Sequence, residues 1–132
     1  ALVGAADWGW APHTLASTSP VMAGTKAIAI TPSAWSGLQL HLTSPFKVTA
    51  GSTLELWVNG ETGGQQITIE LLKNGVRMTD IPLGTLPAAQ WRKVQIDLTA
   101  VRAPDTITEI LVYNGTPSTA NRFSLDEMRL VA

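Results

Sequence analysis

The chain has 132 residues, with nine Lys and Arg residues, ten Asp and Glu residues, and no cysteine. That length suits one domain over residues 1–132, which can bury its own hydrophobic core. The lack of cysteine excludes disulfides, zinc–thiolate centres and cysteine nucleophiles. Near-neutral charge without a basic patch argues against nucleic acid as a partner, and no apolar run is long enough to span a membrane. We therefore expect a monomeric domain that binds neither nucleic acid nor membrane.

Alternating apolar and polar residues recur along the chain and predict β-strands. The alternation is unbroken over 37–43 and 52–59, and Asn59-Gly60 and Asn74-Gly75 mark tight turns, because both residue types tolerate positive φ. The expected strands cover 25–31, 37–43, 52–59, 65–71, 79–83, 91–98, 106–113 and 122–130. Because helical periodicity is never sustained, the sequence predicts an all-β fold, a two-sheet antiparallel β-sandwich of the jelly-roll type.

Each strand of such a sandwich turns one face to the core and the other to solvent. The expected core face is aliphatic and consists of Leu38, Leu40, Leu42, Leu54, Leu56, Val58, Ile67, Ile69, Leu71, Val94, Ile96 and Leu98. The alternate, outward positions are rich in amides, acids and aromatic rings. They include Gln39, His41, Glu55, Trp57, Gln66 and Glu70, with Tyr113 near the end of its strand.

These outward side chains suit a polysaccharide. A pyranose ring has an apolar C–H face that stacks on an aromatic ring, and its hydroxyls pair with amides and carboxylates. Two plainer interpretations stay open: Trp57 can fill a groove between sheet and loop, and His41 can be an ordinary surface histidine. Since a sandwich has two outer faces, the sequence leaves open whether these residues share one of them.

The chain resembles the jelly-roll carbohydrate-binding modules attached to secreted bacterial cellulases and related glycoside hydrolases. The resemblance runs nearly end to end, and within the group it is strongest to the β-glucan-binding modules of carbohydrate-binding module family 81. The segments that carry it are 7–10, 24–30, 35–41, 54–60 with 63–65, 91–94 and 123–130. It implies a secreted, extracellular module that is tethered to a glycoside hydrolase.

The same resemblance implies a ligand groove on a sheet or its rim, lined by tryptophan and tyrosine. Trp57 is then the expected stacking platform, with Trp8, Trp10 and Trp35 as candidate walls, whereas Trp91 is expected to pack against the scaffold. The implied ligand is a cellulose-type β-1,4-glucan, a mixed-linkage glucan or xyloglucan.

A structural calcium ion is also implied, because related jelly rolls often join their first and last strands through one. Asp126 fits the last-strand ligand, and a backbone carbonyl near Thr25 fits the preceding loop. Asp7 is the nearest substitute for the first-strand acid. The alternative is that Asp126 caps a turn or forms an ion pair with a neighbouring arginine.

Three function classes remain from the residues alone. A binding module is favoured over a protein–protein or adhesion sandwich, since sandwiches serve many functions, and over a small glycan-active hydrolase or lyase. A glycosidase needs two carboxylates across a cleft, and only Glu55 and Glu70 could face one another. We therefore expect no enzyme activity.

Overall fold

The computed structural model describes residues 5–7, 9, 13–24, 26–31, 37–114 and 122–132. Over these residues the chain forms ten strands and no helix, so no segment resembling a membrane-spanning helix is found among them. The strands are β1 (Ala5–Asp7), β2 (His13–Ser17), β3 (Ala27–Ile30), β4 (Gly37–Lys47), β5 (Thr53–Asn59), β6 (Gln66–Lys73), β7 (Val76–Thr85), β8 (Trp91–Asp97), β9 (Thr106–Asn114) and β10 (Phe123–Val131).

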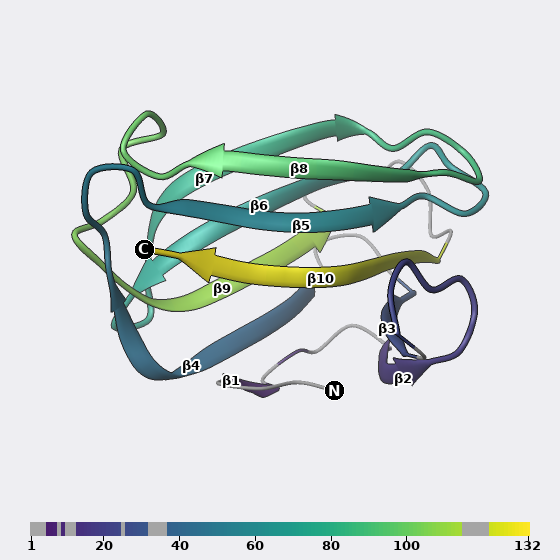
Figure 1. The fold of residues 1–132 in the computed structure, drawn as a ribbon, viewed down its shortest axis with the longest axis horizontal. Coiled ribbons are helices and arrows are strands. Elements are labelled where there is room, and N and C mark those ends of the chain that lie inside the picture. The colour runs from purple at the N-terminus through teal and green to yellow at the C-terminus, as the bar shows by residue number, and fades with distance from the viewer. Residues whose placement is uncertain (1–4, 8, 10–12, 25, 32–36, 115–121) are drawn as a thin grey trace.

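The strands form two five-stranded antiparallel sheets that lie face to face (Figure 1). The sheet nearer the viewer in Figure 1, called the front sheet, has the order β2-β3-β10-β5-β8. The back sheet has the order β1-β4-β9-β6-β7. Most neighbours in each sheet are distant in sequence, as in a jelly roll. The predicted two-sheet β-sandwich is confirmed.

All eight predicted strands are present, and β7 and β4 extend furthest beyond their predicted bounds. β7 begins at Val76, directly after the Asn74-Gly75 turn, and a register shift between Leu71 and Leu72 interrupts the period-two pattern opposite its first residues. β4 continues to Lys47 through a second irregularity after His41. The two strands that the sequence did not predict, β1 and β2, are short and lie at sheet edges.

The interior is aliphatic, and the predicted core face is correct at every position. Ten of the twelve predicted residues belong to the buried cluster, and Leu42 and Val94 pack against it while keeping some exposure. Two further large side chains are buried in this core, Phe123 from β10 and Leu86 from the connection after β7, and the alternation did not predict them. Burial of this face supplies the main driving force for folding.

A buried glutamine ties the β5–β6 connection to the start of β10. Gln65 is fully buried, and its Nε2 donates hydrogen bonds to the carbonyls of Gly60 at 2.7 Å and Arg122 at 3.0 Å. Gly63 and Gly64 precede it with φ of 88° and 89°, which a residue with a Cβ rarely adopts. The sequence motif 63–65 therefore has a structural role.

We predict that Gln65→Ala lowers the free energy of unfolding by roughly 1–3 kcal/mol, because two carbonyls lose their buried donor. Urea unfolding measures this change. Gln90→Ala, at an exposed position, is the matched control and should change the free energy by less than about 0.5 kcal/mol. Equal stability of the two variants would contradict the structural role of Gln65.

Candidate functional site

The outer face of the back sheet, called the back face, is an ordered grid of side chains. The core residues Leu38, Ile69 and Val112 fix which positions point inward, so their strand neighbours point outward. Three rows cross β4, β9, β6 and β7: His41, Glu109, Leu72 and Arg77; Gln39, Leu111, Glu70 and Asp80; Gly37, Tyr113, Thr68 and Pro82.

Five of the predicted sugar-binding residues belong to the back face: Gln39, His41, Gln66, Glu70 and Tyr113. The phase of Tyr113, which the sequence did not settle, follows from its buried neighbour Val112. The tryptophans Trp8, Trp10 and Trp35 lie outside the described residues. The back face therefore brings together amides, acids and one aromatic ring.

Arg77, Glu70 and Tyr113 form the centre of the back face. The Nε of Arg77 lies 3.0 Å from Oε2 of Glu70, and its guanidinium carbon lies 5.5 Å from the centroid of the Tyr113 ring. The side chain of Arg77 is 53% exposed, whereas that of Glu70 is only 4% exposed. A solvent-accessible cation and an aromatic ring thus lie beside a buried carboxylate, and the cation–π contact adds to the ion pair.

Glu70 is placed directly opposite Asp80 on the edge strand β7. Burial raises the pKa of Glu70, a hydrogen bond with Asp80 raises it further, and the charge of Arg77 opposes both effects. Burial also raises the pKa of Tyr113, with help from the negative charge of Glu70. Two carboxyl groups, a cation and a phenol therefore form one electrostatically coupled cluster.

A second buried acid lies in the adjacent row. Oε1 of Glu109 is 3.3 Å from Nδ1 of His41, and Oε2 accepts hydrogen bonds from the Thr108 hydroxyl and the Gly75 backbone. The side chain of Glu109 is 4% exposed, while that of His41 is 36% exposed. His41 is thus partnered by a carboxylate, and its exposed edge faces solvent.

Tyr113 lies between two small residues in its row, so neither row neighbour has a side chain large enough to cover its ring. Its row neighbours are Gly37 and Thr68. A Cβ at Gly37 would lie 2.7 Å from the Tyr113 Cβ and 2.8 Å from the Val112 carbonyl oxygen. Only glycine therefore allows β4 to approach β9 so closely at this point.

Glu55 and Trp57 lie elsewhere, on the outer face of the front sheet. They alternate with the core residues Leu54, Leu56 and Val58 on β5. The expectation that Glu55 could face Glu70 is therefore wrong, since the two belong to opposite outer faces of the sandwich. A hydrogen bond from Arg129 lowers the pKa of Glu55.

The described residues do not assemble the expected calcium site. Oδ2 of Asp126 accepts hydrogen bonds from the Met22 and Ala23 amides at 2.9 and 3.0 Å. Asp7 belongs to the back sheet, whereas Asp126 belongs to the front sheet. Oδ2 of Asp7 lies 2.5 Å from Nε2 of His13. Although burial opposes it, the hydrogen bonds from His13 and the Gly9 amide lower the pKa of Asp7.

No cluster of three or more metal-ligating side chains occurs in the part of the chain that the structure describes. N–H groups that point at the Asp126 carboxylate would face any cation bound there. Thr25 lies outside the described residues, so calcium binding stays a prediction.

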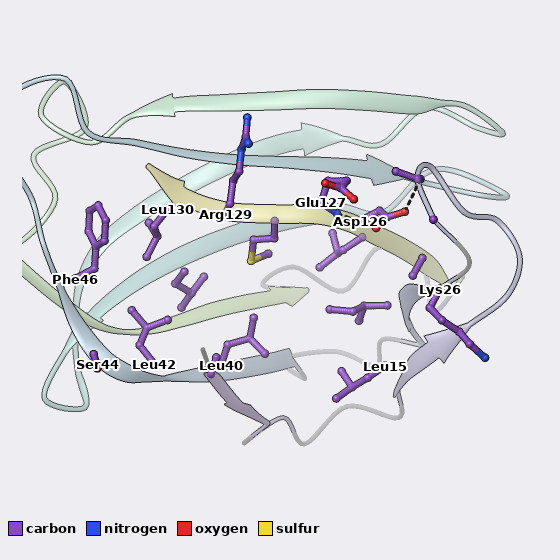
Figure 2. A pocket seen from close by; sticks show the side chains of 18 of the residues that line it. Leu15, Lys26, Leu40, Leu42, Ser44, Phe46, Asp126, Glu127, Arg129 and Leu130 are labelled. Carbon is purple, nitrogen blue, oxygen red and sulfur yellow. Dashed lines mark hydrogen bonds between the residues drawn. The ribbon is translucent and has the colours of Figure 1, made fainter. Parts of the chain in front are cut away.

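A cavity of about 890 Å³ opens at the seam between the sheets, where β3 stops pairing with β10 at Leu125 (Figure 2). Figure 2 shows Leu40, Leu42 and Phe46 of β4 lining it opposite Leu130 of β10. Its lining is mostly aliphatic, with polar groups near the rim, and none of the described sugar-binding candidates contributes to it. We therefore do not assign the sugar site to this cavity, since hydroxyls need polar partners.

Sequence reasoning missed three residues of the back face: Arg77, Asp80 and Glu109. Arg77 follows the Asn74-Gly75 turn, where the irregular register of β7 hides its direction. Asp80 falls within the predicted strand 79–83, and its phase could have been assigned from Ile81, which is buried. Glu109 is next to the buried Ile110, which gives the same kind of signal.

We predict that Glu70→Gln changes the pH dependence of stability. Because the pKa of Glu70 is raised above its ordinary value of 4.5, the folded protein keeps this proton where the unfolded chain has released it. Stability from the protonated group is therefore present at low pH and is lost as pH rises above about 4.5. Relative to Glu70→Gln, the wild type should lose stability in urea unfolding as pH rises from below to above the ordinary glutamate pKa of 4.5.

Parallel stability curves for the wild type and Glu70→Gln would contradict this assignment. Glu127→Gln removes an exposed carboxyl on β10 and controls for the loss of one negative charge.

Comparison with known proteins gives the fold. No protein-family model and no curated protein matches the chain significantly. A family 29 carbohydrate-binding module mutant complexed with mannohexaose matches with a TM-score of 0.62 and 15% identity, over 96% of this chain and 79% of that one. A second mutant, complexed with cellulohexaose, matches with a TM-score of 0.64 and 16% identity over the same shares.

The glycoside hydrolase domain of Endo-D from Streptococcus pneumoniae R6 also matches, with a TM-score of 0.65 and 16% identity, over 96% of this chain and 21% of that one. At these identities the similarity concerns the fold. The chain has the β-sandwich fold seen in family 29 carbohydrate-binding modules.

Proposed function

We propose that the chain binds β-glucan polysaccharide on the back face and catalyses no reaction. The observation that carries this proposal is the placement of Tyr113, Arg77 and Glu70 in contact on one outer sheet face. The Tyr113 ring offers a stacking surface, and Arg77 with Asp80 and Gln39 offers donors and acceptors for hydroxyls. A sheet holds these groups in place, so binding requires little ordering.

The structural neighbours support a hexose polymer as the ligand, because two of them are complexed with hexasaccharides. Within that class we propose cellulose-type β-1,4-glucan, mixed-linkage glucan or xyloglucan, and kinship to family 81. We further propose that Trp8, Trp10 and Trp35 contribute to the same site, with His41 and Gln66 at its margins.

The biological role that we propose is targeting. The match to this chain covers about a fifth of a glycoside hydrolase chain, which supports tethering of this module to such an enzyme. We also propose that the protein is secreted and extracellular. Tethering raises the effective concentration of the catalytic domain at its substrate without adding any contact to the active site.

A second candidate function, adhesion to a protein, has its own observation. Val76 and Met78 at the start of β7 are 58% and 53% exposed, and adjacent exposed apolar side chains can mark an interaction surface. Binding of glycans by the isolated domain separates the two candidates.

We predict that Tyr113→Ala and Arg77→Ala each weaken binding to hydroxyethylcellulose and cellohexaose by about tenfold or more, a change of about 1.4 kcal/mol. The first variant removes the stacking ring, and the second removes its cationic partner. Affinity gel electrophoresis and calorimetric titration measure the loss, and melting temperatures check that each variant is folded.

Lys47→Ala is the matched control for Arg77→Ala. Lys47 is an exposed cation of the same sheet, and it lies opposite Thr106 at the start of β9, whereas Tyr113 lies near the other end of that strand. It should bind as the wild type does. Unchanged binding by folded Tyr113→Ala and Arg77→Ala would remove the back face as the site, and no retardation in any glycan gel would favour adhesion.

Calcium binding at Asp126, as we propose it, requires the ion to displace the Met22 and Ala23 amides from the carboxylate. The prediction is that calcium raises the melting temperature of chelator-treated protein, because an ion that binds only the folded state stabilises it. The increment should vanish in Asp126→Asn. An unchanged melting temperature of the wild type on adding calcium would dismiss the site.

A further inference from the structure

We propose that the outer face of the front sheet, called the front face, is a second glycan-binding platform, built on Trp57 and Trp91. Sequence reasoning treated Trp91 as scaffold. The register instead places Trp91 opposite Asn59, two positions along β5 from Trp57 and on the same face. Both indoles are half-buried, so each is held by its neighbours while part of it remains accessible.

The two tryptophans are diagonal neighbours on adjacent strands, β5 and β8. Diagonal positions in an antiparallel pair lie roughly 7–8 Å apart, which is more than one pyranose ring covers. Two or more linked sugar rings suit this spacing, because successive rings can each contact one indole. The arrangement therefore favours an oligosaccharide or polysaccharide over a single sugar.

Hydrogen-bonding side chains surround Trp57. In its own row it lies between Asp126 of β10 and Lys93 of β8. In the next row Arg129 and Gln95 flank Glu55 and both reach its carboxylate, at 2.9 and 3.3 Å. The front face thus offers hydrogen-bond acceptors and donors, with charges of both signs, around an aromatic centre. Such a mixed set of groups suits the neutral hydroxyls of a sugar better than a charged polymer.

The platform is bounded on one side by the loop before β3. Asp126 accepts hydrogen bonds from the Met22 and Ala23 amides, and this contact holds the loop beside the row that contains Trp57. Met22 on this loop is 39% exposed. Lys93, on the opposite side of Trp57, is exposed, and its charge acts on Glu55 in the next row. A ligand in this row would therefore meet a solvent-accessible cation.

The occupant that we infer is a neutral polysaccharide chain, the same class as proposed for the back face but bound separately. The two faces belong to different sheets and point away from each other. One module could then contact two polysaccharide chains at once, which raises its retention on a polymer above its affinity for a short oligosaccharide.

The test uses the isolated chain carrying Tyr113→Ala, so that binding at the front face is measured without the back face. In hydroxyethylcellulose gels this background should still be retarded. Adding Trp57→Ala or Trp91→Ala should weaken the remaining binding by about fivefold or more. Trp57→Phe, which keeps a stacking ring, should retain most of it.

A control variant and a second measurement accompany this test. Thr53→Ala lies on the front face two rows from Trp57 and should leave binding unchanged. NMR of the indole N–H groups, assigned by substituting each tryptophan with phenylalanine, should show Trp57 and Trp91 shifting on addition of cellohexaose even where an alanine variant is too unstable to use.

Loss of all retardation in the Tyr113→Ala background would overturn the front platform while supporting the back face. Retained retardation that neither tryptophan variant affects, with no shift of either indole signal, would also overturn it. Conversely, wild-type binding that survives Tyr113→Ala but is lost in Trp57→Ala would support the front platform and overturn the back-face proposal.

Discussion

The strict alternation of side chains along each strand is the constraint on which this structure depends. Burying Leu54, Leu56 and Val58 of β5 between the sheets forces Glu55 and Trp57 outward. The same alternation on β6 places Glu70 on the outer face of the opposite sheet. The hydrophobic core therefore decides which polar residues can act together, although it contacts no ligand itself.

Burial of charge distinguishes the back face from an ordinary solvated surface. Glu70 and Glu109 are each 3% exposed although they point away from the core. Desolvation of a carboxylate is unfavourable unless partners offset it, and here Arg77, His41 and Thr108 provide those partners. Arg77 and His41 lie at the exposed ends of these pairs, whereas Thr108 is buried. A ligand bound as we propose would therefore contact the same two side chains that stabilise the buried acids.

The two faces differ in the way they present aromatic surface. On the back face one tyrosine contacts an arginine above a buried acid. On the front face two indoles lie on neighbouring strands among exposed polar groups. A sandwich supports both arrangements because its core separates them, so a substitution on one face should leave the other intact.

Sequence alone determined the class of fold, eight of the ten strands and the whole predicted core face, because period-two alternation is a local property of each strand. It also assigned the outward direction of Gln39, His41, Glu55, Trp57 and the other polar candidates. It missed β1 and β2, whose few residues carry too little pattern, and the direction of Arg77, which a β-bulge conceals.

Only the tertiary structure decided which outward residues are neighbours. Strand order joins β9 to β4 and β6, which are far from it in sequence, and that pairing brings Tyr113 to Glu70 and Arg77. The same order separates Glu55 from Glu70 and places Trp91 on the same face as Trp57. Alternation fixes the face of a residue within its strand, but the register and order of strands are set by contacts between distant segments, which no local pattern contains.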